Sequence, residues 1–168
     1  MSLTDGAGMR HALALGEDPP MTLDSALLWL HAAATTGLAG LVWVVQVVVY
    51  PSFRVAGPTA AWPALHAHHT RAMGLVVALP WAVQGVALAL LLVRRPDGTS
   101  LPLLLLTGVL AATTVAVTVL SSVPLHTRLA GGYDDAVARR LVATNWLRTA
   151  AWTAGAVCAL VLVSQAGS

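Results

Sequence analysis

Four long apolar stretches constrain this chain more than any other feature of its sequence. They cover residues 23–50, 73–93, 101–123 and 144–163 of a 168-residue chain. A helix rises about 1.5 Å per residue, so each stretch is long enough to cross the ~30 Å hydrocarbon core of a bilayer. Only 10% of the residues are charged, far below the share in soluble domains. The sequence therefore predicts an all-α integral membrane protein.

The connections between the apolar stretches predict how these helices are arranged. The second and third stretches are joined by a polar turn at 94–98. Short connections of this kind place consecutive helices antiparallel. We therefore expect a disordered polar tail over 1–22, followed by one transmembrane domain over 23–165 that folds as an up-down four-helix bundle.

Residues at the edges of the stretches predict where individual helices begin and end. Asp24 or Ser25 is expected to cap the first helix by accepting a hydrogen bond from its first turn. Pro51 and Pro124 are expected to end the first and third helices, because proline has no N–H with which to continue the hydrogen bonding. Pro63 is well placed as the first residue of the second helix.

Charge and composition exclude some classes of partner and predict a location. The formal charge of +2 is too small and too scattered to indicate nucleic-acid binding. All nine cations are arginine, and the absence of lysine beside so much alanine, valine and leucine indicates a GC-rich bacterial genome. We expect a multi-pass protein of the bacterial inner membrane, surrounded by the lipid bilayer. The lone Cys158 excludes an intramolecular disulfide.

Polar side chains in or beside the apolar stretches are the first candidates for function, because such groups are costly inside a membrane. In the antiparallel arrangement every helix contributes polar residues to one end of the bundle. His31 lies at the opposite end of the first helix and is expected only to form inter-helix or interfacial hydrogen bonds. The residues of the shared end are Gln46, Tyr50, His66, His69, His126, Asn145, Trp146 and Arg148.

Two kinds of site are open for these residues. His66, His69 and His126 could coordinate a metal or haem iron, since neutral imidazole suits zinc, copper and iron. No carboxylate accompanies them within the spans, unlike in the carboxylate-rich di-iron bundles. The alternative is that they belong to a solvated segment facing the lipid headgroups. Arg148 either pairs with Asn145, a helix-end carbonyl or a bound anion, or extends to the headgroups. The cofactor is therefore open: none, a histidine-ligated metal, or haem.

Two segments resemble the anthrone-oxygenase-like family of small bacterial four-span proteins. Residues 45–53 read Val-Gln-x-x-x-Tyr-Pro-x-Phe, and the segment beginning Val-Pro-Leu-His at 123 precedes a helix carrying Trp146 and Arg148. The resemblance covers roughly 26–165 and implies oxygenation of polycyclic aromatic polyketides without an obvious cofactor. The chain departs from the family pattern at Val49, where histidine is common, and at Gln84, where glutamate is common.

The resemblance implies a role for each polar residue. A histidine would act as the base toward an acidic carbon or phenol, and Arg148 or Asn145 would stabilise the resulting oxyanion. Gln46, Tyr50 and Trp146 are the expected substrate contacts. The residues expected to carry the chemistry are His66, His69, His126, Asn145 and Arg148.

Three functions are compatible with this pattern. The first is an oxidoreductase or monooxygenase acting on a lipophilic aromatic or quinone-like small molecule. The alternative is a non-catalytic membrane scaffold or accessory subunit whose polar residues organise packing. Transport ranks last, because no carboxylate lies inside a span to relay protons or sodium. A homo-oligomer or a partner subunit is left open in each case.

Overall fold

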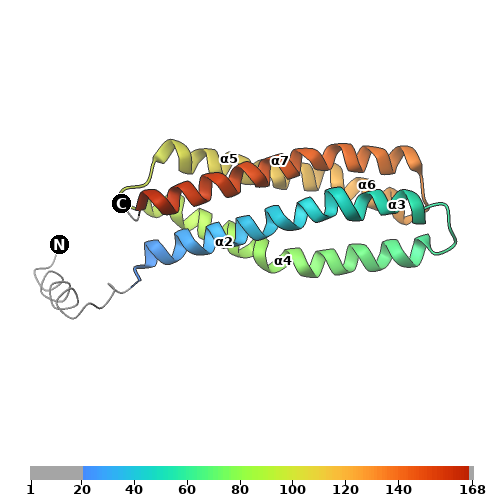
Figure 1. Ribbon diagram of the computed structural model, residues 1–168, viewed down its shortest axis with the longest axis horizontal. Coiled ribbons are helices and arrows are strands. Elements are labelled where there is room, and N and C mark those ends of the chain that lie inside the picture. Colours follow the sequence, from blue (N-terminus) through green and yellow to red (C-terminus); the bar gives the residue numbers. More distant parts are fainter. Residues whose placement is uncertain (1–20, 167–168) are drawn as a thin grey trace, which may run out of the picture.

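The computed structural model describes residues 21–166, which form four long antiparallel helical spans and no strand. The predicted tail over 1–22 lies outside these residues except for its last two. The elements are α2 (Leu23–Val44), η1 (Val45–Val49), α3 (Tyr50–Ala56), α4 (Trp62–Arg94), α5 (Leu101–Val117), η2 (Thr118–Ser122), α6 (Val123–Ala130) and α7 (Asp135–Ala166). The predicted all-α four-helix bundle is confirmed (Figure 1).

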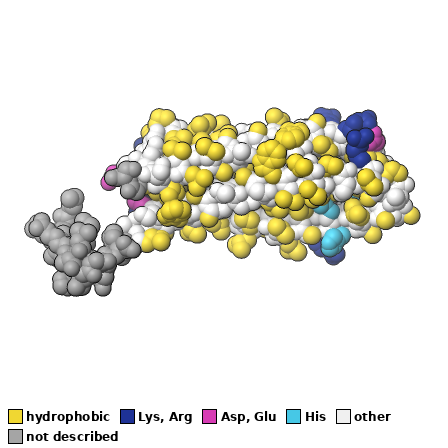
Figure 2. Space-filling model, viewed as in Figure 1, with side chains coloured by type: hydrophobic (Ala, Val, Ile, Leu, Met, Phe, Trp, Pro, Cys, Tyr) yellow, Lys and Arg dark blue, Asp and Glu magenta, His cyan; other side chains and the backbone are white. Residues whose placement is uncertain are grey.

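The four spans are Leu23–Ala56, Trp62–Arg94, Leu101–Ala130 and Asp135–Ala166, and each is long and apolar enough to cross a membrane. Large aliphatic side chains point outward along them; Leu75 is 75% exposed and Leu120 is 78% exposed. Figure 2 shows this apolar surface, with arginine and acidic side chains gathered at the two ends. Such a surface is stable only in lipid, so this is a small multi-pass membrane protein.

The spans do not pack equally against one another. α2 packs along both α4 and α7, and α5 packs along α7, whereas α4 makes few contacts with α5 and α6. In Figure 1 α2 and α7 run beside each other along the length of the bundle. The bundle is therefore closed on three sides and loosely packed on the fourth, between α4 and the third span.

The expected helix ends at Pro51 and Pro124 are wrong. Each proline instead follows a π-helical turn, and the helix continues through it into α3 and into α6. Proline is disruptive in an α-helix because it lacks an N–H and its ring collides with the carbonyl four residues earlier. A wide turn bonded from residue i to i+5, as from Val45 O to Tyr50 N–H and from Thr118 O to Val123 N–H, relieves this conflict.

The expected N-cap of the first helix is also wrong. Thr22, rather than Asp24 or Ser25, is the N-cap, and its Oγ1 accepts a hydrogen bond from the Ser25 N–H at 3.1 Å. Asp24 instead accepts from Arg94 Nε at the end of α4. The first and second spans are thus joined by a charge pair at this end of the bundle.

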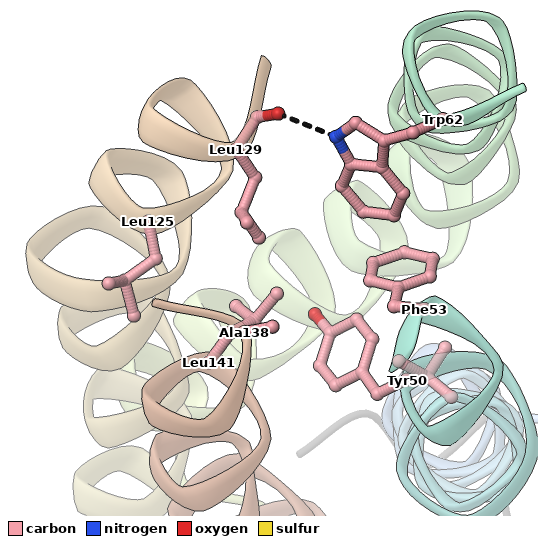
Figure 3. Packing of buried hydrophobic residues seen from close by; sticks show 8 residues of the cluster. Tyr50, Phe53, Trp62, Leu125, Leu129, Ala138 and Leu141 are labelled. Carbon is pink, nitrogen blue, oxygen red and sulfur yellow. Dashed lines mark hydrogen bonds between the residues drawn. The ribbon is translucent and has the colours of Figure 1, made fainter. Parts of the chain in front are cut away.

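The opposite end, which carries the turns at 57–61 and 131–134, is called the histidine end here. An aromatic and aliphatic cluster closes it (Figure 3). Phe53 and Trp62 meet edge to face with their ring centroids 5.2 Å apart, and Trp62 Nε1 donates to the Leu129 carbonyl at 3.0 Å. Tyr133 packs against Trp62 at 5.1 Å and covers Gly57. The two turns are therefore joined by ring packing.

Gly57→Ala should destabilise the fold by about 1–3 kcal/mol, the usual range for overpacking. A Cβ at this position would lie 2.2 Å from Tyr133 Cδ2, which no side chain tolerates without displacement. Gly40→Ala is the matched control, because a Cβ there has no neighbour within 4 Å. Thermal unfolding in detergent measures both, and an unchanged melting temperature for Gly57→Ala would contradict this packing.

Candidate functional site

A hydrogen-bonded row of three side chains links three spans at the histidine end. Tyr50 opens α3, His66 lies near the start of α4, and His126 lies in α6. The Tyr50 hydroxyl oxygen is 3.2 Å from His126 Nε2, and His126 Nδ1 is 3.1 Å from His66 Nε2. A neutral imidazole donates from one nitrogen and accepts at the other. The row is therefore continuous in either direction, depending on the tautomers, and can pass a proton along its length.

His69 completes this group from the next turn of α4. Its ring meets Phe53 edge to face at 4.9 Å between centroids and lies 5.7 Å from the ring of His126. His66 and Tyr50 are buried, whereas His69 and His126 are partly exposed. Two imidazoles of the group are therefore accessible to a molecule beside them.

A second polar network is centred on α7 and is separate from the histidine row. Asn145 Nδ2 donates to Gln46 Oε1 at 2.7 Å, and Gln46 Nε2 donates to the Val142 carbonyl at 3.3 Å. Arg148 Nη1 donates to Asn145 Oδ1 at 3.2 Å and makes a longer contact of 3.5 Å with Ser122 Oγ. Gln46 and Asn145 are almost fully buried. Because Asn145 bonds to both Gln46 and Arg148, this buried pair holds the Arg148 side chain in position.

A cavity of about 450 Å³ connects the two networks. Its polar end is formed by the histidine row, His69 and Arg148, and the rest of its wall is mainly aliphatic. Trp81 and Trp152 also line it and meet edge to face, with an interplanar angle of 70° and 6.1 Å between ring centroids. The cavity is therefore amphipathic, with an apolar body and one basic and hydrogen-bonding end.

The cavity opens sideways between α4 and α6. The residues that line it from α2 and α7 are buried or nearly so, whereas Gly74 on α4 and Val123 and Thr127 on α6 are exposed. This mouth coincides with the loosely packed side of the bundle. Exposed apolar side chains lie close to these mouth residues in the sequence, Leu75 next to Gly74 and Leu120 three residues before Val123.

The structure brings most of the predicted site residues together, but not all. Tyr50, His66, His69, His126 and Arg148 line the cavity, and Gln46 and Asn145 support it. Trp146 lies on the outside of α7, 47% exposed and in edge-to-face contact with Trp43. The structure therefore does not place Trp146 beside the cavity.

The prediction missed most of the lining residues, and three of those missed are polar or aromatic side chains of interest for a ligand. Ser122, Trp81 and Trp152 all face the cavity. Helical spacing could have predicted two of them. Trp152 follows Arg148 by four residues and Ser122 precedes His126 by four, so each shares a helix face with a predicted site residue. The sequence does not predict that Trp81 lines the cavity, because its position beside the cavity depends on how α4 packs against the other helices.

The three candidate metal ligands meet, but not as a ligand set. Among the residues that the structure describes, no group of three histidine, cysteine or acidic side chains is arranged to hold a metal ion. Both ring nitrogens of His126 are already hydrogen-bonded, one to Tyr50 and one to His66. The observed geometry is that of a hydrogen-bonded row.

His31 belongs to a separate polar group nearer the other end. Its Nδ1 lies 3.4 Å from the Gln84 carbonyl, which confirms an inter-helix contact. Gln84 donates to Thr35 Oγ1 at 3.2 Å and accepts from Trp152 Nε1 at 3.4 Å. This group ties α2, α4 and α7 together and touches the cavity only through Trp152.

Comparison of the chain with protein-family models, with curated proteins and with solved structures found no match. The resemblance to the anthrone-oxygenase-like family therefore stays a prediction. The candidate function depends on the residues and the cavity described above.

The Gln46–Asn145 hydrogen bond should give a measurable coupling energy. In a double-mutant cycle with Gln46→Leu and Asn145→Leu, we expect about 0.6–1.7 kcal/mol, the range found for polar pairs between membrane helices. A cycle of Gln46→Leu with Thr113→Val is the control, because Thr113 bonds only to the Val109 carbonyl of its own helix. Unfolding in mixed micelles measures both cycles, and additivity in the first would contradict the pairing.

Proposed function

We propose that this protein is a membrane-embedded oxidoreductase, a monooxygenase in class, acting on a lipophilic aromatic or quinone-like substrate. The observation that carries the proposal is the hydrogen-bonded row Tyr50–His126–His66 at the polar end of an apolar, laterally open cavity. Buried polar groups in a membrane protein are costly and usually functional. A row that only stabilised packing would not need to border a cavity.

The size and lining of the cavity match the proposed substrate class. Small-molecule sites are mostly clefts of about 300–1,000 Å³ with apolar walls and a few placed polar groups. This cavity measures about 450 Å³ and carries its polar groups at one end. A fused aromatic ring system would lie against Trp81 and Trp152, with its oxygen substituent toward His126 and Arg148.

The residues supply proton transfer and charge stabilisation. His126 would act as the base when a substrate takes the place of the Tyr50 hydroxyl at Nε2, where it could remove a proton from a carbon next to a ring carbonyl. The bond of His126 to His66 offers the proton a second position. Arg148 would stabilise the oxyanion that forms on the neighbouring oxygen. With O2 as the oxidant, a CH2 group becomes C=O: one oxygen atom enters the product, and the other leaves as water with the two hydrogens removed.

His126→Ala should lower kcat by about 10²–10⁴-fold, the usual contribution of a positioned acid–base group. O2 uptake with anthrone as the probe substrate, on purified protein in nanodiscs, measures this. His68→Ala is the matched control, because His68 is an exposed residue of the same helix turn as His69 and does not line the cavity. The control should retain full activity.

Equal rates for the parent, His126→Ala and His68→Ala would contradict the proposal. If a second protein then co-purified in fixed stoichiometry, the accessory-subunit function would be favoured. The row would in that case serve only to hold the spans together.

Gly74→Phe should raise KM several-fold with little change in kcat. Gly74 lines the exposed mouth, and a Cβ there has no neighbour within 4 Å, so a phenyl group would extend across the opening. Gly85→Phe is the control, because Gly85 is an exposed position of the same helix, equally free of neighbours and away from the cavity. Equal KM values for the two variants would place the entrance elsewhere.

A further inference from the structure

Arg148 is the only arginine, lysine or acidic residue among those that line the cavity. Its guanidinium carbon stands 4.9 Å from the centre of the Trp152 ring, which is the geometry of a cation–π contact. Its Nη1 faces the neutral acceptors Asn145 and Ser122. Its Nε is buried and has no hydrogen-bond partner. A donor of the guanidinium is therefore left without an acceptor.

No acidic side chain within the described residues 21–166 balances this charge. Asp24 pairs with Arg94 at the far end of the bundle. Asp135 accepts from Arg139 and lies 3.7 Å from Arg54, at the surface of the histidine end. Asp134 caps α7 through the N–H groups of Ala136 and Val137. Asp97 is exposed in the turn between α4 and α5. These four acidic groups of the described residues thus lie at the ends of the bundle, and none of them lines the cavity.

An uncompensated guanidinium inside a membrane protein is unfavourable, because arginine stays protonated and loses its hydration there. Neutral amide and hydroxyl oxygens compensate only part of that loss. An anion bound in the cavity would supply both the missing charge and the missing acceptor for Nε. The site is therefore built for a negatively charged oxygen.

The groups around Arg148 define what kind of anion fits. The Tyr50 hydroxyl interacts electrostatically with Arg148, and His126 lies beside Tyr50. When the Tyr50 oxygen accepts a hydrogen bond from His126 Nε2–H, the Tyr50 hydroxyl can donate its own hydrogen bond to an oxygen placed between it and the guanidinium. The rest of the cavity is apolar, with the rings of Trp81 and Trp152 in its wall. The complementary molecule has one ionised oxygen on an aromatic body.

We infer that the cavity binds an aromatic lipophile with an acidic hydroxyl group, a phenol or an enol, in its ionised form, with the oxyanion on Arg148. The inference rests on the proposed function, since it concerns the same cavity. It adds that the substrate is bound as an anion before any oxidation, and that Arg148 selects acidic over neutral aromatics.

The test uses 4-nitro-1-naphthol as the probe, with its methyl ether as a neutral analogue of nearly the same shape. The ionised naphthol absorbs at longer wavelength than the neutral form, so a pH titration reports the state of the bound probe. In nanodiscs carrying the parent protein, we expect bound probe to ionise at a pH about 1–3 units lower than in empty nanodiscs. The ether should bind at least tenfold more weakly than the naphthol.

Arg148→Gln should abolish the ionisation shift and bring the affinities for naphthol and ether together. Arg71→Gln is the matched control, because it removes an exposed arginine outside the cavity lining, on the helix that carries His69. Gel filtration and thermal unfolding show whether Arg148→Gln is folded. If it is not, the naphthol–ether comparison in the parent still decides the question.

Equal binding of naphthol and ether by the parent, with no shift in ionisation, would overturn the inference. The proposed function is tested separately by O2 uptake. Arg148-dependent binding of the ionised naphthol without O2 uptake on anthrone would leave the inference standing and remove the oxygenase. O2 uptake that depends on His126, together with probe binding indifferent to charge, would do the reverse.

Discussion

A helix that spans a membrane has to satisfy its own backbone hydrogen bonds, and proline removes one donor from that ladder. The first and third spans accommodate their prolines with a π turn directly before Tyr50-Pro51 and Val123-Pro124. Each turn takes up about one extra residue, which rotates all later side chains by about 100°. The arrangement of side chains at the histidine end depends on this rotation.

The size of this rotation can be estimated from the spacing of buried residues along each span. Tyr50 is eight residues after Val42, so an uninterrupted α-helix would turn it about 80° away from the Val42 face. The extra residue reduces this offset to about 20°, and both side chains line the cavity. His126 is brought toward the buried face of Thr114 in the same way. The Tyr50–His126 contact is thus a product of two prolines.

How much of this was predictable differs between the fold and the site. The bundle followed from the length and apolarity of the four stretches, because those properties depend on composition alone. The meeting of His66, His69 and His126 followed from antiparallel topology. A strict i, i+4 reading put Gln46 and Tyr50 on one face, but the π turn separates them: Gln46 meets Asn145, whereas Tyr50 meets His126. The cavity and its mouth depend on inter-helix packing, which single-helix periodicity does not contain.

The closed aromatic end and the open side together determine how the cavity exchanges its contents. Phe53, Trp62 and Leu129 are buried in the cluster at the histidine end, whereas the mouth lies on the side of the bundle, between α4 and α6, where it would open to the acyl chains. A molecule would therefore leave by the route through which it entered. Occupancy would follow the mole fraction of solute in the lipid rather than its aqueous concentration. Adding inert lipid at constant total solute would lower the concentration of solute in the bilayer. The apparent affinity would therefore depend on the amount of membrane as well as on the site.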